Sequence, residues 1–302
     1  IEASVAGGTR CIKALREGLV ANKVSWFAGI LNGTTNFILS KMSDDQSSFD
    51  DALKEAQDLG LAEADPTMDV DGTDAAQKAS ILSALAFNTP FDFKSVSYGG
   101  IESVSSEDIL YTEQLGYSIK HIAYGSIDGN EVSISAYPTL VSKDQLLSQV
   151  GQQMNALEIY CEGIGSTVYY GPGAGPKPTA SAVIADLVDI SNGGWPDSSN
   201  KENKNILCKE GKQTFSRYFN LNVKNEAGAI AKVSSLFAEK NISIEALIQK
   251  ESKSNNNAQL NVPVIIISGP LSDIDAFQMQ DNLDSMEEIP GTPKQFRIQN
   301  AL

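Results

Sequence analysis

A single lysine stands among carboxylates in the interval from residue 63 to residue 78. The segments EADPTMD (63–69) and DGTDAAQK (71–78) together contribute Glu63, Asp65, Asp69, Asp71, Asp74 and Lys78. Residues four apart on a helix lie one above the other, so Asp74 and Lys78 share a face. Such a lysine is a candidate proton donor, and the carboxylates are candidate partners for the amino group of a small molecule. A solvated acidic loop with a surface ion pair fits the same residues, and so does a divalent-ion site built from oxygen ligands.

Two further segments and the only histidine could also carry chemistry. In LNGTTNFIL (31–39), Thr34 and Thr35 could donate hydrogen bonds to a carboxylate or carbonyl, or the segment could be an ordinary capped helix start. GPGAG (171–175) is a tight turn or a glycine loop lying against a cofactor, and the proline after it breaks the GxGxxG fingerprint. His121 is expected in an amphipathic helix with a structural role, which argues against a histidine-based nucleophilic triad.

The elements that must position the acidic interval are two predicted helices joined by a loop. The first spans 48–60, with Ser48 as N-cap and Gly60 as terminator. The turn-rich loop 63–73 is expected to be irregular, and Asp71 or Thr73 to cap an alanine-rich second helix. The predicted elements of this half of the chain are helices 48–60, 74–87 and 106–121, strands 131–141 and 156–163, and a glycine-proline loop that leads into an apolar helix by residue 191.

The pattern restarts after a polar stretch at 192–213 that is typical of a linker. The elements predicted after it are strand 217–224, helix 229–241, strand 242–250, polar hairpin 251–259, strand 260–268, helix 271–286 and a last strand at 295–298. This is the β-α-β-β-α-β order of ferredoxin-like folds. We therefore expect a domain boundary near residue 214.

The composition predicts a globular protein of the reducing cytoplasm. The 302 residues are 41% hydrophobic and 20% charged, and the net charge of −15 disfavours binding to nucleic acid and to anionic membranes. The sequence contains neither an apolar run of spanning length nor a signal peptide. Three scattered cysteines, Cys11, Cys161 and Cys208, indicate neither a disulfide framework nor a zinc site. The absence of a starting methionine suggests a chain cut from something longer.

Four segments resemble, in order and spacing, the successive signatures of homoserine dehydrogenase over residues 2 to about 191. They are EASVAGGTRCIKALREGL, WFAGILNGTTNFILSKM, EAQDLGLAEADPTMDVDGTDAAQKASIL and YYGPGAGPKPTASAVIADLVDI. The tail from residue 217 resembles an ACT regulatory domain. The resemblance implies an α/β and α+β protein, in which a catalytic domain with a mixed sheet and helices precedes a ferredoxin-like (ACT) βαββαβ domain.

The resemblance also implies a division of the chain. We expect residues 1–15 to be the remnant of a nucleotide-binding domain, starting at that domain's last strand. Residues 16–191 would be the catalytic and dimerisation domain, with 171–191 packing back on the cofactor domain. Residues 192–213 would be the linker and 214–302 the ACT domain. A chain without the nucleotide-binding domain is expected to fold but not to turn over.

The roles implied by the resemblance are residue-specific. In the substrate site, Lys78 resembles the proton donor with Asp74 beside it, and Glu63 resembles the carboxylate that binds homoserine. Asp69 is expected either to contact the substrate or to support the residues that do. The other matching positions are Gly60 and Gly175 for the nicotinamide cofactor, Glu2, Val5, Gly7 and Thr9 for a structural monovalent cation such as sodium, and Asn225, Gly228, Asn241 and Ile244 for regulation.

The implied reaction is the NAD- or NADP-dependent interconversion of aspartate 4-semialdehyde and homoserine, in the biosynthesis of threonine, methionine and isoleucine. Threonine is the implied effector of the ACT domain, and a homodimer or higher homo-oligomer is the implied assembly. The alternative from another class is a non-catalytic fragment that senses an amino acid or takes part in assembly.

Overall fold

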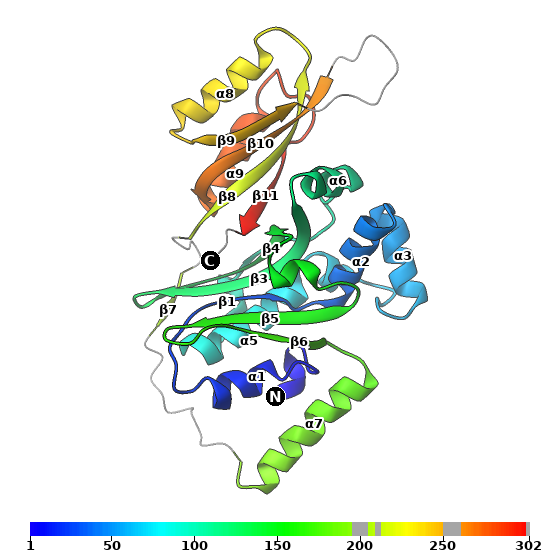
Figure 1. Ribbon diagram of the computed structural model, residues 1–302, viewed down its shortest axis with the longest axis vertical. Coiled ribbons are helices and arrows are strands. Elements are labelled where there is room, and N and C mark those ends of the chain that lie inside the picture. The colour runs from blue at the N-terminus through cyan, green and yellow to red at the C-terminus, as the bar shows by residue number, and fades with distance from the viewer. Residues whose placement is uncertain (195–204, 209–212, 250–260, 300–302) are drawn as a thin grey trace. The chain divides into compact units, whose positions relative to one another are not determined.

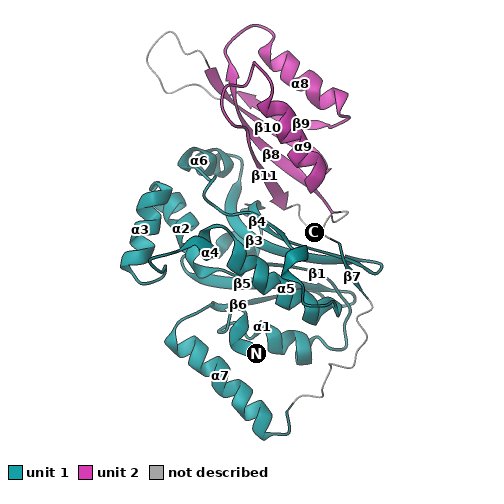
Figure 2. Ribbon diagram, turned by 180° about the vertical axis from the view of Figure 1, so that it is seen from behind, with its two compact units in different colours: residues 1–211 teal, residues 212–302 magenta. Residues whose placement is uncertain are grey.

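The computed structural model describes residues 1–194, 205–208, 213–249 and 261–299, and it divides the chain into two compact units, Ile1–Gly211 and Lys212–Leu302. Figure 1 follows the chain from end to end, and Figure 2 colours the two units separately. The hairpin expected at 251–259 and much of the expected linker lie outside the described residues. No helix within the described ranges is long and apolar enough to cross a membrane.

The first unit is built on a mixed sheet, as predicted. Its long strands pair antiparallel in the order β6-β5-β1-β3-β4, and two short strands, β2 and β7, each run parallel to β4. The strands are β1 (Val24–Ile30), β2 (Ser97–Tyr98), β3 (Tyr117–Asp128), β4 (Glu131–Ser142), β5 (Met154–Cys161), β6 (Gly165–Pro172) and β7 (Ile206–Leu207).

Helices and helical turns surround this sheet. The α-helices are α1 (Cys11–Lys13), α2 (Gly33–Asp44), α3 (Phe49–Asp58), α4 (Thr67–Val70), α5 (Thr73–Phe87), α6 (Ser106–Gln114) and α7 (Pro176–Ser191). The shorter turns are η1 (Glu2–Ser4), η2 (Ala14–Gly18, a π-helical turn), η3 (Phe93–Ser95) and η4 (Leu146–Gln149). In Figure 2, α5 lies in front of the sheet, where it packs against β1, β3 and β4.

Small side chains bring α5 close to the sheet. Its buried face contributes Ala75, Ala76, Ala79 and Leu82 to the main hydrophobic core, where Phe27 also lies. Alanines let a helix approach a sheet closely, and burying them contributes stability in proportion to the apolar area removed from water. The charged residues of the same helix, Asp74 and Lys78, do not belong to this buried face and are partly exposed.

The predicted helix at 48–60 is confirmed as α3, while the predicted cap of α5 is wrong. Ser48 caps α3 by accepting the N–H of Asp51 at 3.2 Å. At the start of α5 the N-cap is Gly72, with φ of +88° and no side-chain hydrogen bond. A Cβ at Gly72 would lie 2.9 Å from the carbonyl oxygen of Gly99, so the close approach of two loops requires glycine there.

Two other secondary-structure predictions are corrected. The loop predicted at 63–73 contains the short helix α4, and the helix predicted at 106–121 ends at Gln114, so residues 117–121 belong to strand β3. Gly116, at φ of +84°, separates helix from strand. His121 thus lies in a strand, where it is 2% exposed and its Nε2 is 2.9 Å from the carbonyl oxygen of Gly99. Burial lowers the pKa of His121, which fits the predicted structural role.

The first residues of the chain form helical turns where the end of a strand was expected. Residues 1–15 contain η1, α1 and the start of η2. The segment is tied to α7 by ion pairs from the N-terminal ammonium to Asp186 and from Lys13 to Asp189, the latter at 2.7 Å. This segment therefore packs against α7.

The second unit has the predicted β-α-β-β-α-β order. Its elements are β8 (Thr214–Lys224), α8 (Ala229–Glu239), β9 (Ile244–Gln249), β10 (Asn261–Ser272), α9 (Asp273–Asp284) and β11 (Lys294–Gln299). The strands pair antiparallel in the order β11-β8-β10-β9. Phe219, Phe237 and Ile266, all fully buried, belong to the core between this sheet and its two helices. The helices supply the apolar cover that one face of the sheet needs.

Candidate active site

A cavity of about 640 Å³ opens where the acidic interval meets the start of α2. Every residue predicted for catalysis, substrate binding or cofactor binding lines it, with the exception of Thr35. The lining residues are Asn32, Gly33, Thr34, Gly60, Leu61, Glu63, Asp65, Met68, Asp69, Asp74, Lys78, Gln153, Ala174 and Gly175. The cavity thus collects side chains from segments that are far apart in the sequence.

Lys78 holds its ammonium group at the wall of this cavity through two hydrogen bonds. Its Nζ donates to Oδ2 of Asp74 at 2.6 Å and to the carbonyl oxygen of Leu31 at 3.0 Å. An ammonium group has three N–H donors, and within the described residues the third has no acceptor. The Lys78 side chain is 23% exposed, so this third donor remains available to a molecule in the cavity.

Asn32 joins the two carboxylates nearest to this lysine, a role that the sequence analysis missed. Its Nδ2 donates to Asp69 at 2.7 Å and to Asp74 at 2.8 Å, while its Oδ1 accepts the N–H of Thr35 at 2.8 Å. As the N-cap of α2, Asn32 is only 4% exposed. The signal in the sequence was an asparagine directly before GTTN, because asparagine is a preferred N-cap.

Asp69 has a raised pKa in this setting. Burial is the main cause, and the neighbouring charge of Asp74 adds to it. The hydrogen bond from Asn32 and the charge of Lys78 oppose this rise. The hydrogen bond from Asn32 and the positive charge of Lys78 therefore stabilise the ionised form of Asp69.

Glu63 and Asp65 differ in the hydrogen bonds that their carboxylates accept. Glu63 is exposed, and within the described residues its carboxylate has no partner; only its main-chain oxygen accepts a bond, from Gln57. Asp65 accepts from the N–H and the hydroxyl of Thr67, and these bonds lower its pKa. Glu63 is thus the carboxylate of this loop that is free to bind a ligand.

The two threonines that were predicted to bind the substrate lie at different depths. The hydroxyl of Thr34 lines the cavity but donates to the carbonyl oxygen of Leu61 at 2.8 Å, so only its acceptor capacity remains. Thr35 is 1% exposed and its hydroxyl donates to the carbonyl oxygen of Asn32. Thr35 therefore lies behind the cavity wall, where it supports Asn32.

Gly60 and Gly175 lie on the rim of the cavity with backbone conformations that favour glycine. Gly60 has φ of +71°, and no heavy atom lies within 4 Å of the position that a Cβ would take. Gly175 has φ of +116° and precedes α7 as its N-cap. At Gly175 the nearest atom to that position is Cδ of Pro178, at 3.7 Å, which is an ordinary van der Waals contact. A main chain without a Cβ lets a flat ring approach the backbone closely.

The residues proposed for a monovalent cation fall in the first turns of the chain. Glu2 is 3% exposed, its Oε1 has no partner, and burial raises its pKa. The hydroxyl of Thr9 donates a hydrogen bond to the carbonyl oxygen of Ala6. The carbonyl oxygen of Val5 accepts a hydrogen bond from the thiol of Cys11. Gly7 donates its N–H to Gly173. A buried carboxylate oxygen without a partner is a donor of the kind that a hard cation prefers.

No group of three or more histidine, cysteine, aspartate or glutamate residues suited to a metal ion occurs in the described part of the chain. This finding includes the acidic interval, for which a divalent-ion site was one of the open interpretations. Three of the carboxylates there are engaged by other groups: Asp69 by Asn32, Asp74 by Lys78, and Asp65 by Thr67.

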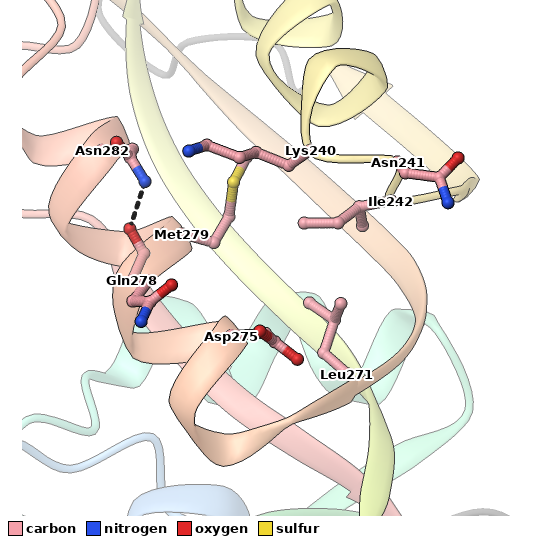
Figure 3. A pocket seen from close by; sticks show the side chains of 8 residues that line it. All are labelled: Lys240, Asn241, Ile242, Leu271, Asp275, Gln278, Met279 and Asn282. Atoms are coloured by element: carbon pink, nitrogen blue, oxygen red, sulfur yellow. Dashed lines mark hydrogen bonds between the residues drawn. The ribbon is translucent and has the colours of Figure 1, made fainter.

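The predicted regulatory residues lie in the second unit, and one of them lines a pocket. This pocket has a volume of about 240 Å³ and is lined by Lys240, Asn241, Ile242, Leu271, Asp275, Gln278, Met279 and Asn282. In Figure 3 the Lys240 side chain extends toward Asn282, whereas the Asn241 side chain points away from the other labelled side chains. Asn241 has φ of +57° in the turn after α8. The other three are Gly228, which is the N-cap of α8, Ile244, which begins β9, and the exposed Asn225.

Comparisons with known proteins agree on one family. Residues 11–188 match the family model "Homoserine dehydrogenase". A homoserine dehydrogenase of Neisseria gonorrhoeae is 44% identical over 86% of this chain and 62% of its own length. A crystal structure of a homoserine dehydrogenase from Thiobacillus denitrificans superposes with a TM-score of 0.90 at 37% identity, covering 99% of this chain and 70% of that one.

A hyperthermophilic archaeal homoserine dehydrogenase in complex with NADPH is more distant, with a TM-score of 0.56 and 32% identity over 65% of this chain and 56% of that one. The chain thus spans between 56% and 70% of the length of these three proteins. The family model alone covers more than half of the chain. The chain belongs to the homoserine dehydrogenase family, whose members are oxidoreductases.

Proposed function

We propose that this chain carries the substrate-binding and proton-transfer site for the interconversion of aspartate 4-semialdehyde and homoserine. The observation that carries the proposal is the ammonium group of Lys78, fixed by Asp74 and Leu31 with one donor left for the cavity. The family membership supports the reaction type. The carboxylates around the lysine support an amino acid as substrate.

In this mechanism Lys78 stabilises and then protonates the reacting oxygen. The nicotinamide cofactor supplies the hydride to the aldehyde carbon when it is bound. As the carbonyl oxygen gains negative charge, the free N–H of Lys78 donates to it and delivers the proton that completes the hydroxyl group. In the reverse direction, Lys78 in its neutral amine form accepts the hydroxyl proton of homoserine and becomes an ammonium group again. Asp74 and the carbonyl oxygen of Leu31 hold the ammonium group in place for both steps.

The acidic side chains bind the substrate's ammonium group in this proposal. Glu63 is the first candidate, because its carboxylate has no partner among the described residues. Asp69 is the second, because it lines the same cavity and is partly buried. A charge-assisted hydrogen bond between carboxylate and ammonium is stronger than a bond between neutral groups. Thr35 contributes by holding Asn32.

The cofactor of this reaction is NADP or NAD, and Gly60 and Gly175 are the positions that we propose to lie against its nicotinamide ring. The open space at Gly60 and the extended, positive-φ backbone at Gly175 fit a flat ring at the rim of the cavity. The archaeal relative was determined with NADPH, which supports a nicotinamide cofactor for this family. The substrate and the cofactor would then meet beside Lys78.

We further propose a structural sodium ion at Glu2, Val5, Gly7 and Thr9. The support is the buried Oε1 of Glu2, which lacks a partner.

We also propose a cytoplasmic location, in agreement with three cysteines that are free in the structure.

For the second unit we propose the role of an ACT regulatory domain that binds threonine, with the protein acting as a homodimer or larger homo-oligomer. The β-α-β-β-α-β order with sheet order β11-β8-β10-β9 supports this proposal. The regulatory residues remain Asn225, Gly228, Asn241 and Ile244, and the pocket at Asn241 supports a small polar ligand (Figure 3).

The test is a dehydrogenase assay on the full-length protein, with L-homoserine and either NAD or NADP, which follows the absorbance of the reduced nicotinamide. We expect oxidation of L-homoserine and, because the carboxylates select an ammonium group, little or no oxidation of 4-hydroxybutyrate, which lacks it. Failure to oxidise homoserine with either cofactor would refute the proposed activity. Equal rates on the two alcohols would refute the role of the carboxylates.

A further inference from the structure

Lys120 is a buried lysine on β3 that the proposed reaction does not use. The residue is only 6% exposed, and its Nζ donates a hydrogen bond to the carbonyl oxygen of Val150 at 2.7 Å. Within the described residues, no second acceptor reaches this ammonium group. Burial lowers the pKa of Lys120 to about 8, and the charge of Asp44 opposes the shift. A buried ammonium group with two unsatisfied donors is costly unless something else pairs with it.

Lys120 lines a pocket of about 270 Å³ between α2, α6, β3 and the turn η4. This is below the roughly 300–1,000 Å³ typical of sites for drug-sized ligands, so the pocket suits a small molecule. Its residues are not those of the cavity around Lys78. Two carboxylates, Asp44 and Glu113, line the same pocket. Glu113 accepts a hydrogen bond from the hydroxyl of Ser43, whereas Asp44 is exposed and has no hydrogen-bond partner within the described residues.

The charges of this pocket discriminate between classes of ligand. A simple anion at Lys120 would face the repulsion of Asp44 and Glu113, and a simple cation would face the buried ammonium group. A molecule with both charges satisfies both sides at once. The hydroxyl of Ser40 accepts the N–H of Gln152 at 3.1 Å, and its own proton remains to be donated to a carboxylate.

We propose that this pocket binds a small zwitterionic α-amino acid, with its carboxylate on Lys120 and its ammonium group on Asp44 and Glu113. All of its lining residues belong to the first unit, and none of them lines the substrate site. The loop that follows Val150 borders both cavities of the first unit, because Gly151 lines this pocket and Gln153 lines the one around Lys78. An amino acid bound here would therefore lie next to a wall of the substrate site.

The experiment is isothermal calorimetry on the full-length protein with glycine, L-alanine and L-threonine at millimolar concentration. Acetate and methylammonium serve as probes that carry one charge each. The variants are Lys120→Met and Glu113→Gln, with matched controls at exposed positions outside the pocket, Lys94→Met and Glu107→Gln. Glu63→Gln separates binding in the substrate cavity from binding at Lys120. Lys120→Gln serves as a second variant if Lys120→Met does not fold, as judged by circular dichroism.

We expect at least one amino acid to bind with a component that Lys120→Met abolishes and that Glu113→Gln weakens at least about tenfold. The two control variants and Glu63→Gln should retain this component, and acetate should bind at least about tenfold more weakly. A component unchanged in Lys120→Met and Lys120→Gln, or the absence of binding by all three amino acids, would overturn the proposal. Acetate binding as tightly as the amino acids would also overturn it, because the site would then be a simple anion site.

Discussion

A single isosteric substitution at Asn32 would replace its two hydrogen bonds to Asp69 and Asp74 by repulsion between carboxylates. Asn32→Asp keeps the shape of the side chain and its function as an N-cap, because aspartate and asparagine cap helices about equally well. It replaces the Nδ2 donor, at 2.7 and 2.8 Å from the two carboxylates, by a third carboxylate oxygen. The perturbation therefore acts on the bridge and spares the cap of α2.

The magnitude follows from the bonds that are lost. A hydrogen bond to a charged group contributes about 1.5–3 kcal/mol, so the loss of two such bonds costs about 3–6 kcal/mol before any repulsion. Like charges about 4 Å apart add up to about 4 kcal/mol at the effective dielectric constant of a protein surface. Protonation of one carboxylate limits the total. We expect the free energy of unfolding to fall by at least about 3 kcal/mol at neutral pH.

The pH dependence has a definite sign. Burial already raises the pKa of Asp69, and the change at residue 32 removes the hydrogen bond that opposes this rise. A carboxylate whose folded pKa lies above its unfolded value destabilises the folded state when it is ionised. The stability of Asn32→Asp relative to the wild type should therefore recover as the pH falls through that raised pKa.

Urea unfolding across this pH range measures the change in the free energy of unfolding. The same substitution should displace Asp74 and Lys78, so we expect the turnover of homoserine oxidation to fall at least about tenfold. Asn130→Asp, at an exposed position after β3, is the matched control. An Asn32→Asp protein within about 1 kcal/mol of the control at neutral pH would refute the reasoning.

Three other predictions follow from the geometry. Glu63→Gln should raise the Michaelis constant for homoserine more than that for the cofactor, since its free carboxylate binds the substrate's ammonium group; steady-state kinetics with unchanged constants would contradict this. Gly72→Ala should lower the free energy of unfolding by about 1–3 kcal/mol in urea titrations, because of its φ of +88° and the 2.9 Å approach to Gly99; a neutral effect would exclude strain there. Lys120, with a pKa lowered to about 8, is less protonated in the folded state, so stability relative to Lys120→Met should rise with pH from about 8 toward the usual lysine value, by at most about 3.4 kcal/mol; a flat difference would show that the group is not desolvated.

The sequence predicted the parts of the site that lie close together in the chain. Asp74 and Lys78 are one helical turn apart, and α3 ends at the loop that carries Glu63, so local rules were enough to bring these residues together. The second unit was equally accessible, because its alternation of strands and helices follows the hydrophobic pattern of each element.

The bridging role of Asn32 could not be predicted, because its partners lie 37 and 42 residues away and meet it only through tertiary packing. The donor of Thr34 is consumed by Leu61 for the same reason. Residues 117–121 were assigned to a helix because β3 is buried on both faces near His121, and such a strand has no alternating pattern.

The N-cap of α5 was not predicted because a neighbouring loop, and not the local sequence, requires a glycine at that position. Asp71 and Thr73 are common capping residues, and sequence rules favour them over Gly72. The carbonyl oxygen of Gly99 leaves no room for a side chain at residue 72. Asp71 is used instead to accept the N–H of Thr73 at 2.8 Å.

The central claim, that Lys78 transfers the proton, is tested most directly by Lys78→Ala with chemical rescue in the full-length protein. We predict that homoserine oxidation falls at least about 100-fold, the scale of a lost general acid or base, with little change in stability. Ethylamine should restore part of the lost rate, because the shortened side chain opens space for an amine in the cavity beside Asp74. Lys94→Ala, at an exposed position, should keep normal turnover. Near-normal turnover in Lys78→Ala without added amine would contradict the account.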